Sequence, residues 1–305
     1  MGRGQGIRRN GGMKRKMLFN ADKGVLTNVD LKQAKYKFVY FFLVLFIVIA
    51  CLAALIPALW MVCSAFKEPA EIVSGKSGFF PKSFDIKKVW NLWTQLKIYE
   101  TFLNSLILAA GCVVADVLIN GFAGYVLSRL KPKGSGFYFA VVSWLMMMPA
   151  TASLVPNYML FKKLGMLNTY YPMYLMAATN MFNILLFKSS FDGISISLIE
   201  SAKIDGASVF RIFARIIVPL SVPVIVTVSL FTFNGQLGNF FWPYLLISVP
   251  EKNVMGVRIY QMKNSTLSVD KQMMMLLFSV IPQFTVFLLF QKYIVGGINI
   301  GGVKG

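Results

Sequence analysis

Few residues in this chain could carry acid–base, nucleophilic or metal chemistry. None of the 305 residues is a histidine, which removes the commonest general base and the commonest metal ligand. Cys51, Cys63 and Cys112 lie within or at the ends of apolar segments and lack disulfide or metal-ligand spacing, so we interpret them as small packing residues. No Gly-x-x-x-x-Gly-Lys-Ser/Thr phosphate loop is present. We therefore predict no catalytic residue and no metal site.

Polar side chains inside apolar segments are the remaining candidates for a chemical role. Asp116 is the one acidic residue within a predicted membrane span, and Asn120 follows it by one helical turn on the same face. An ionisable residue at that depth is by default a functional candidate, here for lining a solute pathway, although a hydrogen bond between helices would use the same groups. Both interpretations stay open. The full set of pathway candidates is Asp116, Asn120, Asn180, Asn183, Asn234, Gln236, Asn239 and Trp242.

These candidates belong to a chain whose composition is that of a helical membrane protein. The sequence is 56% hydrophobic, has a mean hydropathy of +0.63 and is 14% charged. Soluble domains carry about 25% charged residues. The apolar residues come in blocks long enough to cross a bilayer, which takes roughly 20 helical residues. We predict an all-α membrane protein with six transmembrane helices, at about Phe38–Cys63, Phe102–Leu127, Phe137–Pro156, Tyr171–Phe187, Ile217–Phe233 and Met274–Ile294.

Prolines and glycines modify the fifth of these spans. Pro219 and Pro223 stand near its start, and Gly235, Gly238 and Pro243 interrupt the apolar stretch that follows. Residues that break helices are tolerated at membrane depth only where neighbouring protein satisfies the freed backbone groups. We expect a helix, then a bend, then a short external or re-entrant piece.

Basic residues set the predicted orientation. Nineteen of the 31 Lys and Arg residues fall in the first 37 residues and in the connections that share their side of the membrane. Because positive charge is enriched in cytoplasmic loops, both termini are predicted to be cytoplasmic. Topology thus explains the net charge of +19, and no nucleic-acid partner is expected. The predicted parts are a basic cytoplasmic tail at 1–37, the first helix with an external loop at 38–101, a membrane domain at 102–294 and a Gly-rich cytoplasmic tail at 295–305.

One polar segment between two spans has neither lipid nor a core of its own to pack against. It covers Glu200–Pro223, on the side predicted to be cytoplasmic. Ser195 and Ser197 offer caps for a short helix, Gly206 permits a turn, and Ser208 could cap a second helix. The segment could merely connect two spans. The more economical interpretation is a helix that docks onto another protein at the cytoplasmic face.

Several motifs of the chain, in this order, resemble those of one family. Glu200-Ser-Ala-Lys-Ile-Asp-Gly-Ala207 resembles the EAA motif of inner-membrane permease subunits in binding-protein-dependent ABC importers of the carbohydrate, maltose-type class. Gly121-Phe-Ala-Gly-Tyr125 with Ser128-Arg129 is similar to that family's A-Y-x-x-x-R turn, and Gly301-Gly302-Val303-Lys304-Gly305 is similar to its terminal sequence. The resemblance covers about 102–305 and implies the six-helix bundle of type I ABC importers.

The resemblance also implies a role and a set of partners. The segment at about 198–208 would be the coupling helix seated in a cytoplasmic ATPase, through Glu200, Ser201, Ala202, Asp205, Gly206 and Ala207. The chain would form half of the pathway for a sugar, with an oligosaccharide as the expected substrate. It would lie in the bacterial cytoplasmic membrane, in contact with membrane lipid. Its partners would be a second, different permease subunit, two ABC ATPase subunits and an extracytoplasmic solute-binding protein. It would hold no cofactor, while ATP and Mg would bind to the ATPase.

Two departures from the family pattern bear on this interpretation. Ser201 stands where the motif usually has Ala, which exchanges one small residue for another. Gly238-Asn239 stands where the family usually has a Trp-Asn pair, which puts substrate details in doubt. Two alternatives stay open: an ion-coupled secondary transporter that uses Asp116, and the same permease role for a non-sugar organic solute. A membrane-embedded enzyme ranks behind them, because no convergent acid–base pair is visible.

Overall fold

The chain is helical throughout the part that the structure describes. The computed structural model describes residues 34–75, 78–263 and 267–297, and within these ranges it contains helices and no β-strand. This confirms the predicted all-α class. The chain divides into two compact units, Met1–Ala58 and Leu59–Gly305. The two predicted cytoplasmic tails fall almost entirely outside the described residues, apart from the residues at 34–37 and 295–297, which are helical.

The described part of the first unit is the beginning of helix α1 (Ala34–Phe66). Every residue from Phe38 to Ala58 is exposed, and nearly all of them are apolar. A helix that is apolar on all sides needs apolar surroundings, and a lipid bilayer provides them for a helix of this length. α1 therefore agrees with the first predicted span, although it begins four residues earlier.

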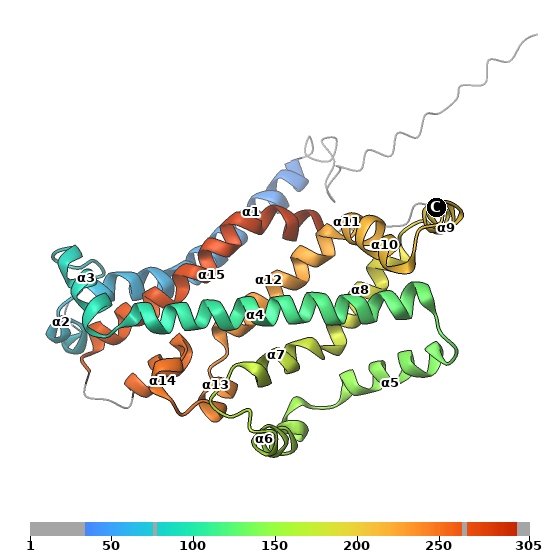
Figure 1. The fold of residues 1–305 in the computed structure, drawn as a ribbon. Coiled ribbons are helices and arrows are strands. Elements are labelled where there is room, and N and C mark those ends of the chain that lie inside the picture. Colours follow the sequence, from blue (N-terminus) through green and yellow to red (C-terminus); the bar gives the residue numbers. More distant parts are fainter. Residues whose placement is uncertain (1–33, 76–77, 264–266, 298–305) are drawn as a thin grey trace, which may run out of the picture. The chain divides into compact units, whose positions relative to one another are not determined.

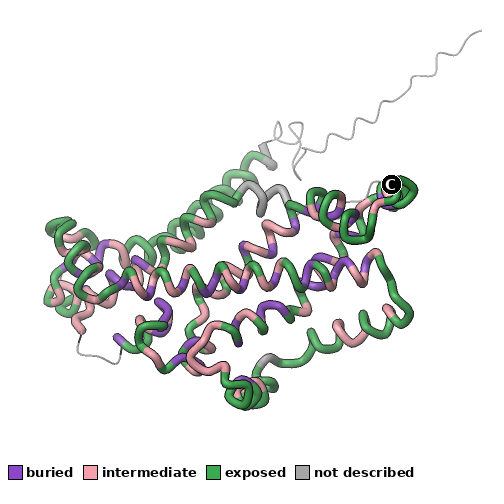
Figure 2. The backbone as a smooth tube through the Cα atoms, in the orientation of Figure 1, coloured by how far each residue is buried: buried purple, intermediate pink, exposed green. Residues whose placement is uncertain are grey.

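The second unit is built around α4, which packs against α7, α8 and α12, while α12 also packs against α15 (Figure 1). Buried positions recur along α4, whereas α5 has no buried residue (Figure 2). The unit contains α2 (Pro69–Ser74), α3 (Ile86–Gln95), α4 (Ile98–Tyr125), α5 (Ser135–Met147), α6 (Leu154–Lys163), α7 (Tyr171–Ala178), α8 (Met181–Asp192), α9 (Ile196–Ile204), α10 (Val209–Ile212), α11 (Val218–Leu220), α12 (Val222–Gly238), α13 (Phe241–Leu246), α14 (Met255–Lys263) and α15 (Val269–Gly297).

Short irregular turns join several of these helices. The chain forms π-helical turns over Val126–Leu130, directly after α4, and over Phe213–Ile217, between α10 and α11. The stretch predicted as an external loop before Phe102 instead holds α2 and α3, and α4 already begins at Ile98. α3 forms there because the Asp85 carboxylate caps it, accepting a hydrogen bond from the Lys87 amide at 2.8 Å.

Three helical stretches in the described residues are long and apolar enough to cross a membrane: 37–66, 98–130 and 269–291. Three bent pairs of helices pass the same test together, so the total reaches six if each pair is one span. They are 135–147 with 151–163, 181–192 with 196–204, and 209–220 with 222–238. Six spans with both termini cytoplasmic therefore stay a prediction.

The predicted fourth span, Tyr171–Phe187, is not one helix. α7 ends at Ala178 and α8 begins at Met181. Asn180 interrupts the helix because it adopts extended backbone and its side-chain oxygen accepts a hydrogen bond from the Asn183 amide at 3.2 Å. The Asn side chain thus starts a new helix at the point where the sequence predicts continuity.

The fifth span is shifted relative to its predicted bounds, Ile217–Phe233. α11 ends at Leu220, the chain bends by 78°, and α12 continues to Gly238. Pro223 falls within the first two residues of α12, where its missing amide proton costs no helical hydrogen bond. The 78° bend precedes α12, whereas the bend expected after the helix corresponds to the break at Asn239, which α13 follows. That α13 is external or re-entrant stays a prediction.

Candidate functional site: a polar cavity and a cytoplasmic corner

The Asp116 carboxylate joins three helices in the middle of the bundle. Asp116 is fully buried on α4. Its Oδ1 accepts a hydrogen bond from Asn120 Nδ2 at 2.6 Å, and its Oδ2 accepts one from Asn183 Nδ2 of α8 at 2.7 Å. Thr232 of α12 also donates to Oδ2. The expected pairing of Asp116 and Asn120 on one helix face is therefore present, and it extends to two further helices.

Asn120 extends this cluster to the break between α7 and α8. Besides contacting Asp116, its Nδ2 donates to the carbonyl oxygen of Ala177 at 2.8 Å. That carbonyl lies in the last turn of α7, where backbone oxygens have no partner within the helix. The cluster therefore satisfies backbone that the break frees inside the bundle, which is the requirement for irregular backbone at membrane depth. Hydrogen bonding between helices is thus one role of these residues.

A cavity of about 480 Å³ lies beside the same carboxylate. Its volume is in the range of small-molecule sites, roughly 300–1,000 Å³. Six of the eight pathway candidates line it, and they come from α4, α8, α12, α13 and the breaks before α8 and after α12: Asp116, Asn180, Asn183, Gln236, Asn239 and Trp242. Asn120 does not line the cavity but donates a hydrogen bond to Asp116, which does. Asn234 is not among the lining residues.

The sequence reasoning missed part of this wall. Thr232, Met173, Met176 and Phe231 also line the cavity. Thr232 donates to Asp116 across 116 positions of sequence, and a lone threonine in an apolar helix gives no signal of such a partner. The lining combines amides, one carboxylate and an indole ring, so it can exchange hydrogen bonds with hydroxyl groups and cover one apolar ring face. Lys and Arg are missing from that lining among the described residues.

The second region is the corner formed by α9 and α10. Ile199 of α9 is buried and Ala202 and Ala207 are half-buried, whereas Glu200 and Ile204 project outward. Ser201, Lys203 and Asp205 are also exposed, and the Ile204 side chain is 87% exposed. The corner therefore presents an acidic and an apolar group to its surroundings. A partner protein could bury both.

Gly206 makes the turn between α9 and α10. Its φ is +76°, a left-handed conformation that residues with a Cβ rarely adopt. Apart from its two sequence neighbours, no described residue has an atom within 4 Å of the position that a Cβ would take, so the described fold does not crowd Gly206. Ser208 then caps α10 as expected, accepting a hydrogen bond from the Arg211 amide at 3.3 Å.

The expected caps of α9 are only partly present. Ser195 occupies the N-cap position, but its side chain makes no capping hydrogen bond. The Ser195 and Ser197 hydroxyls instead lie 2.7 Å apart and bond to each other. The prediction that these serines cap α9 is therefore wrong in its hydrogen bonds, although the helix does begin directly after Ser195.

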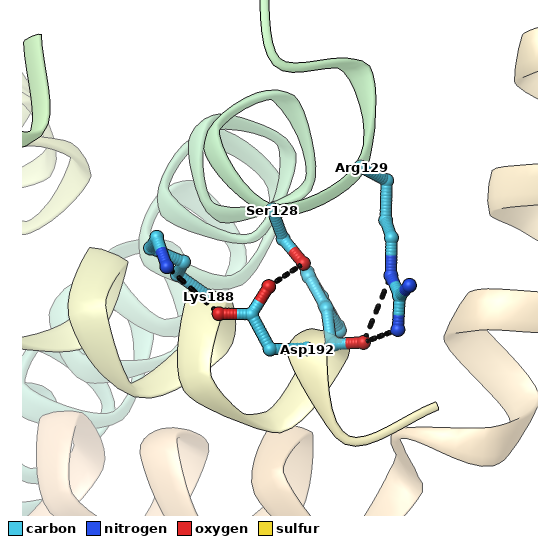
Figure 3. Close-up of polar contacts among 5 residues, drawn as sticks. Ser128, Arg129, Lys188 and Asp192 are labelled. Atoms are coloured by element: carbon cyan, nitrogen blue, oxygen red, sulfur yellow. Dashed lines mark hydrogen bonds and ion pairs between the residues drawn. The ribbon is translucent and has the colours of Figure 1, made fainter. Parts of the chain in front are cut away.

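Side chains of the π-helical turn after α4 contact the end of α8 and the linker that leads to α9 (Figure 3). Asp192 accepts hydrogen bonds from Ser128 Oγ at 2.6 Å and from Lys188 Nζ at 2.7 Å. Arg129 donates to the carbonyl oxygens of Phe191 and Ile194.

Comparison with known proteins places this architecture in one family. Residues 120–299 match the family described as "Binding-protein-dependent transport system inner membrane component", and this range contains α9 and most of the cavity wall. The probable ABC transporter permease protein YurM of Bacillus subtilis (strain 168) is 35% identical over 85% of this chain and 87% of its own length. The chain belongs to this family.

As an inner-membrane component of this family, the chain is a permease subunit of an ABC transport system, in keeping with the non-catalytic role predicted for it. The galactooligosaccharides transport system permease protein GanQ of Bacillus subtilis (strain 168) is 30% identical over 85% of this chain and 94% of its own length. A bacterial ABC transporter that imports the acidic polysaccharide alginate has a chain of the same fold, with a TM-score of 0.76, 21% identity and coverage of 89% of this chain and 99% of that one.

Proposed function

We propose that this permease subunit forms half of the pathway of an ATP-driven oligosaccharide importer and couples to a cytoplasmic ATPase through α9. The proposal is carried by one observation: α9 lies at a corner where Glu200, Ile204 and Asp205 are exposed within the described residues. Relatives named for galactooligosaccharide and arabinooligosaccharide transport support the substrate class. The second permease subunit would be a different chain, with two ATPase subunits and an external binding protein completing the importer.

The contact with the ATPase would use both the acidic and the apolar side chains that α9 exposes. Glu200 and Asp205 would meet donors of the ATPase, and Ile204 would enter an apolar depression. ATP and Mg would bind to the ATPase, whose closure would move α9 as a lever. Because Gly206 is uncrowded within this chain, a side chain added there would act through the turn or through the partner.

The cavity beside Asp116 would be this subunit's part of the solute pathway. Asn180, Gln236 and Asn239 would offer amides to sugar hydroxyls, and Trp242 would cover a ring face. Asp116, Asn120 and Asn183 would chiefly hold the wall in shape, because their mutual hydrogen bonds already use most of their polar atoms. Asn234, which lies off the cavity, would have a packing role.

Purification of the tagged chain from its native membranes in mild detergent, with partners identified by mass spectrometry, tests the coupling proposal. We expect a P-loop ATPase and a second permease with the wild type, and loss of the ATPase or of its activity with Gly206→Asp. Gly165→Asp is the matched control, because Gly165 also has a positive φ of 67° and no atom within 4 Å of its missing Cβ.

Comparison of Gly206→Asp with Gly165→Asp distinguishes an effect on coupling from an effect on folding. Equal loss of the ATPase in both variants would show that strained glycine turns alone disturb the subunit, and the coupling assignment would fail. A wild-type chain that purifies alone, or as a homo-oligomer without ATPase, would overturn the importer proposal. Uptake driven by an ion gradient, with Asp116 as the relay, would then take its place.

A further inference from the structure

A side chain from the π-helical turn after α4 bridges the bend between α8 and α9. α8 ends at Asp192, α9 begins at Ile196, and the two helices meet at 75°. Arg129 donates from Nε to the Phe191 carbonyl oxygen at 3.0 Å, and from Nη2 to the carbonyl oxygens of Phe191 and Ile194. Phe191 belongs to the last turn of α8, and Ile194 belongs to the linker. One guanidinium group therefore spans the bend.

The chemistry of this contact suits an arginine. The last carbonyl oxygens of a helix have no partner within the helix, and the negative end of the helix dipole favours a cation. A guanidinium group is planar and carries its donors in a fixed fork, so one side chain can bond two carbonyls in a defined relative position. A lysine at the same place would bring the charge but not the fork.

Arg129 is itself held in place by the turn that carries it. It lies in the π-helical turn Val126–Leu130, next to the buried Ser128, whose hydroxyl bonds Asp192. One turn earlier, Gly124 brings α4 and α8 together so closely that a Cβ on it would lie 2.6 Å from the Phe187 Cβ. The position of Arg129 at the α8–α9 bend therefore depends on the close contact between α4 and α8.

α4 also carries the cavity residue Asp116. Arg129 lies 13 positions after Asp116, which corresponds to roughly 20 Å of helix. We infer that Arg129 is a positioning residue that fixes the α8–α9 angle and makes α9, α8 and α4 move together, so that a push on α9 reaches the cavity wall. This inference rests on the proposed coupling function of α9, but the stiffness of the hinge is measurable without it.

Hydrogen exchange on the purified full transporter in lipid nanodiscs tests the hinge directly. In Arg129→Gln, we expect amides of the segment 194–199 to exchange at least tenfold faster, while peptides from 105–120 keep their wild-type rates. Arg129→Lys should fall between the two. Arg215→Gln is the matched control, because Arg215 is an exposed arginine in the π-helical turn after α10 and its loss removes the same charge.

The same samples test whether the hinge serves coupling. We expect Arg129→Gln to retain the co-purified ATPase but to lose at least tenfold of the ATP hydrolysis stimulated by the liganded binding protein, with Arg129→Lys partly rescued. Wild-type exchange rates in Arg129→Gln would overturn the inference, and so would faster exchange with unchanged stimulation. If Arg129→Gln does not accumulate, Arg129→Lys against Arg215→Gln decides. If the wild type carries no ATPase, the proposed function fails, while the exchange rates still decide the hinge.

Discussion

At the scale of single residues, the Asp116 cluster combines support of the fold with access to a cavity. Asp116 has two acceptor oxygens for three side-chain donors on three helices. Asn120 and Asp116 are local partners, so their spacing on one helix predicts their contact. Thr232 and Asn183 reach the carboxylate only because α4, α8 and α12 pack together. The local sequence around each residue does not predict that packing. The residue types were therefore predictable, and their meeting point was not.

Asp116→Asn should destabilise the subunit by about 1–3 kcal/mol, because the new amide nitrogen would face a buried donor and leave a polar group unpaired. The measurement is unfolding of the purified subunit in detergent by increasing SDS, followed by its intrinsic fluorescence. Asn234→Ala is the control, since it alters a polar residue of a membrane helix that does not line the cavity. A midpoint equal to that of the wild type in Asp116→Asn would contradict the role of the carboxylate as a bridge.

Gln236→Ala should weaken transport by raising the solute concentration for half-maximal uptake about fivefold, which corresponds to one lost hydrogen bond of about 1 kcal/mol. The ATPase should stay bound, because Gln236 lies at the cavity and not on the cytoplasmic corner. Uptake of a labelled oligosaccharide into vesicles gives the value, with Asn234→Ala as the control. Equal shifts in both variants would remove the cavity from the pathway.

At the scale of elements, the close contact between α4 and α8 depends on Gly124 far more than on Gly121, although both glycines face Phe187. A Cβ on Gly124 would lie 2.6 Å from the Phe187 Cβ and 3.0 Å from the Lys188 nitrogen, so the helices would have to separate. A Cβ on Gly121 would meet only the Phe187 ring, at 3.8 Å, which is ordinary contact. The two positions lie one turn apart on the same helix and differ in the space available.

Gly124→Ala should therefore lower stability by about 1–3 kcal/mol through overpacking. Gly121→Ala should be neutral or raise stability by up to about 1 kcal/mol, because Ala is the better helix former. The SDS unfolding midpoints of the two variants measure the difference. If Gly124→Ala unfolds at the same concentration as Gly121→Ala, the α4–α8 contact is looser than the structure has it.

Elements also mark where the sequence ceases to be informative. The EAA-like run Glu200–Ala207 and its Gly206 corner follow from local residue types, and α9 with its left-handed turn appears at that place. The break at Asn180 was not predicted, because an asparagine in an apolar stretch reads equally as a weak span or as an N-cap. Asn120 of α4 favours the break because it donates a hydrogen bond to the carbonyl oxygen of Ala177. That contact is long-range, so the local sequence does not predict it.

At the scale of the whole molecule, the orientation in the membrane follows from charge and can be tested residue by residue. Positive charge is retained in the cytoplasm during insertion, so the connection at 128–136 should be inside and the one at 157–170 outside. Lys133 and Lys163 are exposed representatives of the two. With Cys51, Cys63 and Cys112 replaced by alanine, Lys163→Cys should react in intact cells with a thiol reagent that cannot cross membranes. Lys133→Cys should react only after the cells are permeabilised.

The reverse labelling pattern would place α9 and Gly206 outside the cell, where no ATPase could reach them, and the coupling proposal would fail with the topology. Labelling of both cysteines in intact cells would mean that 135–147 and 151–163 do not together form one span. Labelling of Lys163→Cys alone agrees with a bent third span that returns the chain to the exterior. The corner at α9 then lies on the cytoplasmic side only if an odd number of spans separates it from Lys163. The fourth predicted span, Tyr171–Phe187, would be that single span if α7 and α8 cross the membrane together.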